Sequence, residues 1–445
     1  MEANKHEASA SSADQRLGTA PLTPLIFKLA LPTALAQLVN MLYNIVDRIY
    51  VGHIPETGSL ALAGLGVTYP IIVLITAFSN LIGMGGAPRA SVAMGRGDYK
   101  TAEKILGNCI TLLIALSVAL SVVFTIFGEP VLRAFGASEN TLPYAMAYLR
   151  IYLLGTIFVQ FTLGMTPFIT NQGFAMTSMA TTCIGAVSNI ILDPIFIYGF
   201  NMGVEGAAIA TILSQALSAV WVLIFFTGKR NILRIRKQNL FPSAKTLALV
   251  LSLGVSPFLM TATECVIQLA FNTGAAAYGG DDAVAIMSIL FSVAQIANLP
   301  VQGFCQGAQP VVGFNFGARK LERVRQAFKI MLAVSMGVTT VVVGAVEIVP
   351  QLFLGLFSSD AALIALGTGP LRVYMLGYFF MGAQLACQQT FLGLGEAKIS
   401  MFIALLRKVI LLLPLSLVIP QVFGALGLSQ LLGLYVAEPD RKSVV

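Results

Sequence analysis

Long apolar segments alternate with short polar segments along almost the whole chain. A helix needs about 20 apolar residues to cross the ~30 Å hydrocarbon core of a bilayer. The segments of that length lie near 24–50, 59–85, 105–127, 142–163, 176–198, 206–227, 246–274, 283–308, 327–349, 371–394 and 401–422, with a doubtful twelfth from 424. The pattern therefore predicts an all-α polytopic membrane protein.

The composition supports this prediction. Of 445 residues, 57% are hydrophobic and only 11% are charged, whereas soluble domains carry about 25% charged residues. A soluble core of this size would leave too few charges at its surface, so the excess apolar residues must face lipid. Soluble and disordered classes are thereby excluded.

The basic residues are distributed unevenly between the two sides of the predicted membrane. If the N-terminus lies inside, the outer connections contain only Arg133 among the 27 Lys and Arg. Twenty-one others lie in inner segments or, like Lys28, at the inner end of a span. This asymmetry predicts a multi-pass protein of the cell membrane with a cytoplasmic N-terminus. It also explains the net charge of +7 without a nucleic-acid partner.

A duplicated unit is indicated by residues that recur after 220 to 222 positions. Gly97, Gly173 and Gly206 find counterparts in Gly317, Gly395 and Gly427. Two six-helix bundles in the same orientation are therefore expected, although chance alignment of frequent glycines is the alternative. The predicted division is a cytoplasmic tail (1–23), an N-lobe (24–227), a cytoplasmic basic linker (228–245), a C-lobe (246–437) and a C-terminal tail (438–445).

The twelfth helix is too short in this sequence. From Gly427 only 11 residues precede the polar sequence Glu438-Pro439-Asp440. About 11 residues cannot span ~30 Å as a helix. We therefore expect the last helix to be incomplete.

Four acidic residues fall within predicted spans: Asp47, Asp193, Glu264 and Glu347. A carboxylate at the centre of a membrane helix costs about 2.5 to 3.5 kcal/mol, which makes each one a candidate functional residue. Glu347 lies three residues before Pro350 at the end of its span, and we interpret it as interfacial. The other three fall in the outer half of the membrane.

An oxygen-rich cluster is predicted around the first two of these acids. Asn189 and Asp193 are four residues apart and share one helix face, Pro194 removes a backbone donor next to them, and Thr211 lies at a comparable depth. Such a cluster suits a proton or a hard monovalent cation. The alternative is a hydrogen-bonded network that only locks the helices together.

Signatures of an enzyme or a metal site are weak. The two histidines are His6 and His53, outside the spans, and the five cysteines show no CxxC spacing. Glycine clusters lack the ending of a P-loop. We expect no catalytic residues, no metal, no cofactor and no enzymatic activity.

The sequence resembles the multidrug and toxic compound extrusion (MATE) transporters, and within them the MepA-like branch. The resemblance is carried by LALPTALAQLVNMLYNIVDRIYVG (29–52), GRGDYKTAEK (95–104) and SNIILDPIFIYGFNMGVEGAAIAT (188–211). It implies that Asp47, Asn189, Asp193 and Thr211 match a cation-coupling site in the N-lobe. It also implies a possible substrate or cation site at Glu264 in the C-lobe.

The resulting functional hypothesis is a monomeric antiporter that exports amphipathic, often cationic, drugs or toxic compounds in exchange for H⁺ or Na⁺. Such xenobiotic efflux confers antibiotic resistance in the family. An alternative is a flippase or exporter of a lipid-linked or other endogenous metabolite. The cavity of such a lipid exporter is expected to contain more cationic residues than this sequence places within its spans. The candidates are Arg150, Arg372, Arg407 and Lys408, most of which lie near span ends. A membrane-embedded enzyme is the third hypothesis.

Overall fold

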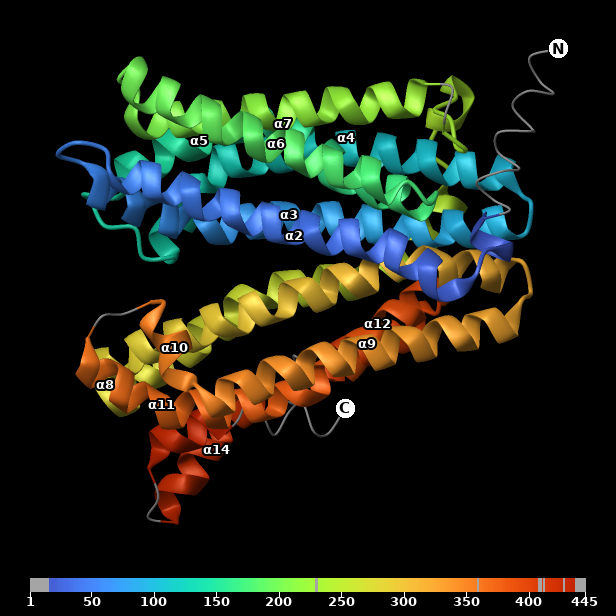
Figure 1. Cartoon of the computed structure of the whole chain (residues 1–445). Helices are drawn as coiled ribbons and strands as arrows, with labels where there is room; N and C mark the ends of the chain where they lie inside the picture. Colours follow the sequence, from blue (N-terminus) through green and yellow to red (C-terminus); the bar gives the residue numbers. More distant parts are fainter. Residues whose placement is uncertain are drawn as a thin grey trace.

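The structure, a computed structural model, describes residues 16–228, 231–357, 360–406, 410, 413–426 and 429–436. Among these residues the regular elements are helical. The first bundle contains α2 (Leu22–Gly52), α3 (Gly58–Gly95), α4 (Tyr99–Ala134), α5 (Leu142–Asn171), α6 (Ala175–Pro194), the π-helical turn η1 (Ile195–Gly199) and α7 (Gly203–Thr227). Figure 1 shows these elements as a bundle of long helices in the upper part of the view.

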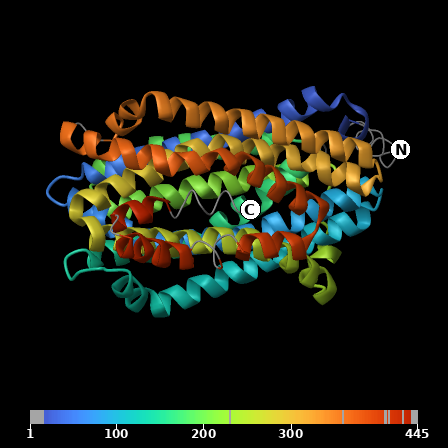
Figure 2. The ribbon, with the colours of Figure 1, turned by 90° about the horizontal axis from the view of Figure 1, so that it is seen from below.

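The second bundle begins after the short 3-10 turn η2 (Lys237–Leu240). It contains α8 (Ala244–Gly317), α9 (Leu321–Ile348), α10 (Pro350–Gly355), α11 (Ala361–Leu376), η3 (Gly377–Phe380), α12 (Met381–Leu394), α13 (Ala397–Leu405) and α14 (Leu413–Ala425). Seen from below, the helices of both bundles run along a common direction (Figure 2). This is the arrangement expected of membrane-spanning helices.

The long element α8 is two helices joined at a kink. Gly280 has φ 68° and ψ −158°, which interrupts the helical backbone, and such a conformation is open to glycine because it has no Cβ. We call Ala244–Gly280 the first arm of α8 and Asp282–Gly317 the second arm. The two arms are separate membrane spans.

Ten helices in the described part of the chain are long and apolar enough to cross a membrane. They coincide with the first ten predicted spans, so the all-α polytopic fold is confirmed. The predicted eleventh span corresponds to α13 and α14, and the residues between them lie partly outside the described part. Beyond α14, helical structure is described over 430–436 only, and Arg407 and Lys408 also lie outside the described residues.

One set of predicted boundaries was wrong. We expected a polar connection over 86–104, but α3 continues to Gly95 and α4 begins at Tyr99. Asp98 caps α4 by accepting a hydrogen bond from the Thr101 backbone at 3.0 Å. The prediction failed because hydropathy detects only the lipid-crossing part of a helix, whereas these helices extend beyond it.

The internal repeat is confirmed by the helix boundaries. One constant offset in residue number relates the starts of α2 and α8, the ends of α3 and α8, the starts of α4 and α9, and the starts of α6 and α13. The left-handed residues repeat at the same offset, because Gly97 and Gly173 correspond to Arg319 and Gly395. The predicted pairing of Gly97 with Gly317 was therefore wrong by two residues, since the ends of α3 and α8 pair Gly95 with Gly317. The two bundles are therefore copies of one helical unit.

The bundles contact each other closely at the end of the molecule near the N-terminus and lie farther apart at the opposite end (Figure 1). Glycines make the close approach possible. A Cβ on Gly254 in the first arm of α8 would overlap the backbone of Leu81 in α3. A Cβ on Gly307 in the second arm would lie 2.5 Å from Cα of Ala30 in α2. We call these two contacts the glycine clasp.

The segment 231–243 is packed against the first bundle. Asn108 of α4 donates hydrogen bonds to the carbonyls of Asn239 (3.0 Å) and Phe241 (3.2 Å) and accepts one from the Ser243 backbone at 2.6 Å. Glu103, on the same helix, forms a 2.5 Å ion pair with Arg236. The connection between the bundles is therefore a fixed strap along α4.

Candidate functional site

The candidate site is built on the C-terminal halves of α2 and α6. Asp193 is the penultimate residue of α6 and is fully buried. Asn189, one turn earlier and 1% exposed, donates a hydrogen bond from Nδ2 to Asp193 Oδ1 at 3.0 Å. The predicted placement of the amide and the carboxylate on one helix face is therefore confirmed by the geometry.

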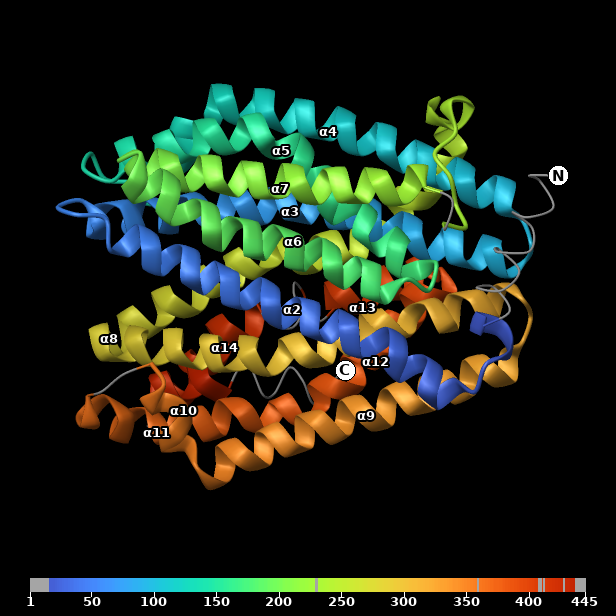
Figure 3. The ribbon, with the colours of Figure 1, turned by 45° about the horizontal axis from the view of Figure 1, so that its top comes forward.

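The second carboxylate comes from α2, which packs along α6 (Figure 3). The carboxyl groups of Asp47 and Asp193 lie within hydrogen-bond range of each other. Two carboxyl groups at this distance inside a membrane protein cannot both stay ionised at low cost. A proton or a cation between them removes that cost.

Three oxygens of this acid cluster lack a donor. Within the described residues, no hydrogen-bond partner reaches Asp47 Oδ1, Asn189 Oδ1 or Asp193 Oδ2, although each atom is buried. Buried acceptors without donors are costly, and native structures keep them rare. A bound proton or cation is the kind of species that would satisfy these acceptors.

The turn after Asp193 fixes the two helices relative to each other. Pro194 ends α6, and the chain continues as the wider π-helical turn η1. In this turn Tyr198 donates a 2.6 Å hydrogen bond from its hydroxyl to the carbonyl of Tyr50 in α2. A π-helical turn is a frequent feature of functional sites in helices.

Thr211 of α7 lies at the edge of the cluster. Its side chain lies near Tyr148 of α5, and Tyr148 is close enough to Asp47 for an electrostatic interaction. The structure therefore connects Thr211 to the acid cluster through a tyrosine.

Sequence analysis missed the tyrosines around the acids. Tyr43 of α2 lies near both carboxyl groups and Tyr148 of α5 lies near Asp47. Tyr152 of α5 stacks on Tyr148 with ring centroids 6.0 Å apart. Tyr148 and Tyr152 are each 4% exposed. Their spacing of four residues on one face of a predicted span was the available signal, because buried tyrosine hydroxyls need a polar partner.

Glu264 lies apart from this cluster. It is an exposed residue of the first arm of α8, in the other bundle. Glu347, at the end of α9, has its carboxylate 3.8 Å from Nε of Arg372. Its position and partner agree with the interfacial interpretation.

A duplicated bundle of membrane helices with a buried acid cluster in one copy defines a class of transporter-like membrane proteins. The family model named MatE matches this chain twice, over residues 32–195 and 257–418. The two matches cover most of the chain and reproduce the internal repeat. The chain belongs to the MatE family.

Known relatives extend over nearly the whole chain. The multidrug export protein MepA of Staphylococcus saprophyticus is 27% identical over 400 residues, which is 90% of this chain and 87% of that protein. MepA of Staphylococcus aureus is also 27% identical, over 92% of this chain and 89% of its own.

Solved MATE structures share the fold. A MATE protein in complex with MaD3S has a TM-score of 0.88 at 22% identity, covering 97% of this chain and 96% of its own. A MOP-superfamily transporter from Pyrococcus furiosus has a TM-score of 0.87 at 23% identity, with 97% and 96% coverage.

Proposed function

We propose that this protein is a secondary active antiporter that exports amphipathic, often cationic, drugs or toxic organic compounds in exchange for protons or sodium ions. The carrying observation is the acid cluster, in which three buried oxygens of Asp47, Asn189 and Asp193 lack a donor within the described residues. The relatives named multidrug export protein support the substrate class. The expected location is the cell membrane, with the N-terminus in the cytoplasm and the chain as a monomer.

The acid cluster couples two conformations of the protein. Binding of the ion joins α2 to α6 by neutralising the two carboxyl groups, and release leaves them to repel each other. An ion that binds one arrangement of the bundles more tightly shifts the equilibrium toward it. With a cytoplasmic N-terminus, the glycine clasp closes the cytoplasmic side and the bundles diverge toward the outside.

The experiment is dye export by membrane vesicles energised separately by a proton gradient and by a sodium gradient. The variants are Asp47→Asn and Asp193→Asn, which keep the side-chain shape but cannot release a proton or carry a negative charge. Asp98→Asn is the matched control, because Asp98 is an exposed carboxylate outside the spans.

We expect the parent and Asp98→Asn to export with one of the two gradients, and we expect both cluster variants to lose gradient-driven export. Full export by the cluster variants under both gradients would overturn the coupling role. A parent that exports dye only when ATP is added would overturn secondary transport altogether.

A further inference from the structure

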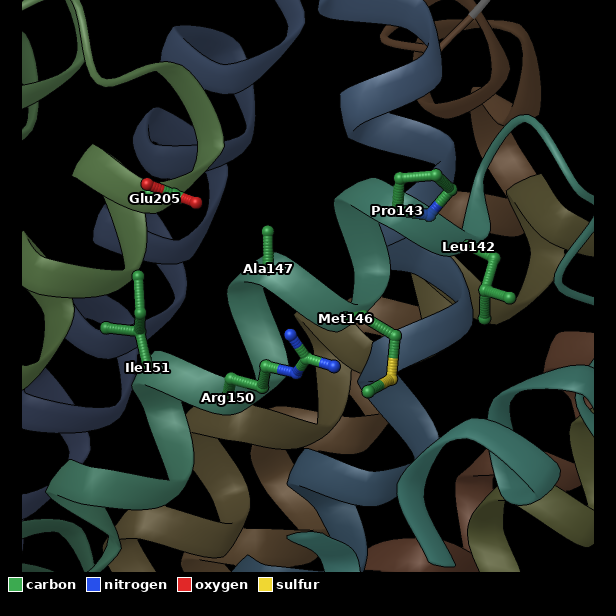
Figure 4. Close-up of a pocket in the computed structure, with 7 residues that line it drawn as sticks. All are labelled: Leu142, Pro143, Met146, Ala147, Arg150, Ile151 and Glu205. Carbon is green, nitrogen blue, oxygen red and sulfur yellow. The ribbon is translucent and has the colours of Figure 1, made fainter.

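A groove lies between the first turns of α5 and α7, at the end of the first bundle opposite the glycine clasp. Its volume is about 620 Å³. Leu142, Met146, Arg150 and Ile151 line it from α5, and Glu205 lines it from α7 (Figure 4). Gly155 lies against Ile212 of α7, so the two helices meet one turn below Arg150 and close the floor of the groove.

The groove carries two opposite charges that do not pair with each other. Arg150 and Glu205 are exposed, and in the described part of the chain neither has a hydrogen bond or an ion pair. Figure 4 shows them on the two sides of the groove, one on each helix. A ligand that satisfies both must carry a negative and a positive group within one small headgroup.

The groove lies at the membrane boundary. Glu205 belongs to the first turn of α7, and Arg150 is eight residues after the start of α5, or about 12 Å along the helix. The 30 residues of α5 span about 45 Å, against a hydrocarbon core of about 30 Å. Shared between the two ends, the excess of about 15 Å places the first turns of the helices in the headgroup region and Arg150 a few Å below it, from where its long side chain reaches the headgroups.

An apolar surface continues from the charges toward the membrane centre. Leu154, one turn beyond Arg150, is 81% exposed, and Leu213 and Leu217 of α7 are 41% and 49% exposed. In a membrane protein these side chains face lipid tails. The charges and the leucines together match a headgroup followed by an acyl chain.

We propose that this groove binds a phospholipid whose headgroup contains a phosphate and a primary ammonium group, as in phosphatidylethanolamine. The Arg150 guanidinium binds the phosphate through paired hydrogen bonds. The Glu205 carboxylate accepts hydrogen bonds from the ammonium. A choline headgroup is charged but has no N–H to donate, and a glycerol headgroup donates only from neutral hydroxyls, so only the ammonium gives Glu205 charge-assisted hydrogen bonds. The site is independent of the proposed transport function.

The test is lipid retention by the purified full-length protein, measured by native mass spectrometry after exchange into detergent with equal amounts of ethanolamine, choline and glycerol phospholipids of identical acyl chains. We expect the parent to retain the ethanolamine lipid preferentially. Arg150→Gln should lower retention of all three lipids, with the ethanolamine lipid falling about tenfold, since it loses a charge-assisted contact.

The second variant separates the two contacts. Glu205→Gln should keep phosphate binding but reduce the ratio of ethanolamine to choline lipid by about tenfold, and Arg150→Lys should retain part of the binding. Arg133→Gln and Glu139→Gln, exposed charges of an outer-loop ion pair in the same bundle, are matched controls and should behave as the parent.

Equal retention of the three lipids by the parent would overturn the proposal, as would unchanged lipid ratios in both groove variants. Soluble glycerophosphoethanolamine is the arm that distinguishes a lipid from a free headgroup. If this soluble headgroup competes as well as the whole lipid, the acyl chain contributes nothing to binding, and the leucine surface does not belong to the site. Because each readout is lipid binding, these results do not depend on whether the protein exports drugs.

Discussion

The two bundles share a backbone but not a chemistry. Their helices begin and end at positions related by one constant offset, as Leu22 is to Ala244 and Tyr99 to Leu321. At the same offset, however, Asp47, Asp193 and Thr211 correspond to Leu269, Leu415 and Gly433. Duplication has therefore preserved the helices while the acid cluster exists in one copy. A single charged site is sufficient for a two-state coupling device, and a second would add another desolvation cost.

What the copies do preserve is the contact between them. Gly85 and Gly307 occupy equivalent positions of the repeat, and each lies against the first helix of the opposite bundle. Gly85 approaches Val250 and Gly254 in the first arm of α8, and Gly307 approaches Ala30 in α2. The close approach of two backbones requires glycine on both sides of the pseudo-symmetric interface.

The largest expected effect distinguishes the acids of the two bundles. Asp193→Asn should reduce gradient-driven export at least about 100-fold, because the amide cannot exchange a proton and its partner Asp47 then remains a lone buried carboxylate. Glu264→Gln, in the exposed position of the C-lobe, should reduce export by a much smaller factor. Initial rates in energised vesicles, normalised to the amount of protein, provide the measurement.

Equal losses in the two variants would show that both bundles carry coupling chemistry. Thermal unfolding of each purified variant is the control, since a folding defect would lower the midpoint temperature as well as the rate. If Asp193→Asn retained parental export while Glu264→Gln lost it, the roles assigned to the two bundles would be reversed.

The second largest effect is expected from variants that disrupt the glycine contacts between the two bundles. Gly254→Ala and Gly307→Ala each place a Cβ against the backbone of the opposite bundle, which should destabilise the clasped arrangement by about 1 to 3 kcal/mol. Distances between spin labels on the two bundles should lengthen at this end. Gly337→Ala is the matched control in α9, since nothing lies within 4 Å of its added Cβ, and helix propensity should stabilise it by about 0.8–1.0 kcal/mol.

Gly85→Ala, which places a Cβ against the backbone of Val250, should give a shift similar to that of Gly307→Ala if the pseudo-symmetry of these two equivalent positions extends to energetics. If only one of the two variants lengthened the spin-label distances, only that half of the interface would depend on its glycine. Parental distances in both would rule out the clasp as a determinant of the closed end.

Local signals predicted much of this architecture. The ten confirmed spans follow from runs of apolar residues, and the Asn189–Asp193 hydrogen bond follows from a spacing of four in a helix. The repeat was visible because left-handed turn positions favour glycine, as at Gly97, Gly173 and Gly395.

Features that depend on packing between distant segments were not predicted. Tyr148 comes near Asp47 only because the fold places α5 and α2 in the same bundle, about 100 residues apart along the chain. The strap over 231–243 appeared to be only a charged linker, because nothing in its composition reveals that Asn108 binds it. The kink at Gly280 is likewise a property of the backbone angles.

A third, smaller effect concerns this strap, which only the first bundle has among the described residues. The residue that corresponds to Asn108 in the second copy of the repeat is Ile330, which is apolar. Asn108→Ala removes three hydrogen bonds to the strap and should lower the free energy of unfolding by about 1 to 2 kcal/mol, because water can replace part of the bonding at this edge. Chemical denaturation would measure the loss, with Thr125→Ala on the exposed face of α4 as the control.

An unchanged stability in Asn108→Ala would show that the strap is held by the Glu103–Arg236 ion pair instead. Combining Asn108→Ala with Glu103→Gln then distinguishes the two contacts: additive losses indicate independent attachment. If Thr125→Ala lowered the free energy of unfolding as much as Asn108→Ala does, the loss in Asn108→Ala would not be specific to the strap.

The smallest expected effect concerns the ion pairs at the end of the bundles opposite the glycine clasp. In the first bundle Arg133 contacts Glu139 at 2.6 Å and Glu129 at 3.0 Å, whereas the pair Arg372–Glu347 of the second bundle is 3.8 Å long.

The adjacent Arg133 lowers the pKa of Glu139, in the loop after α4, below its ordinary value of 4.5. A lowered carboxyl pKa in the folded state adds stability above the unfolded value, and this is lost as pH falls through the folded one. Glu139→Gln should therefore lower Tm only slightly at pH 7, since exposed pairs contribute little, and the difference from the parent should vanish as pH falls through the lowered folded pKa. A clear drop in Tm at pH 7 that 1 M salt does not diminish would contradict a screened surface pair.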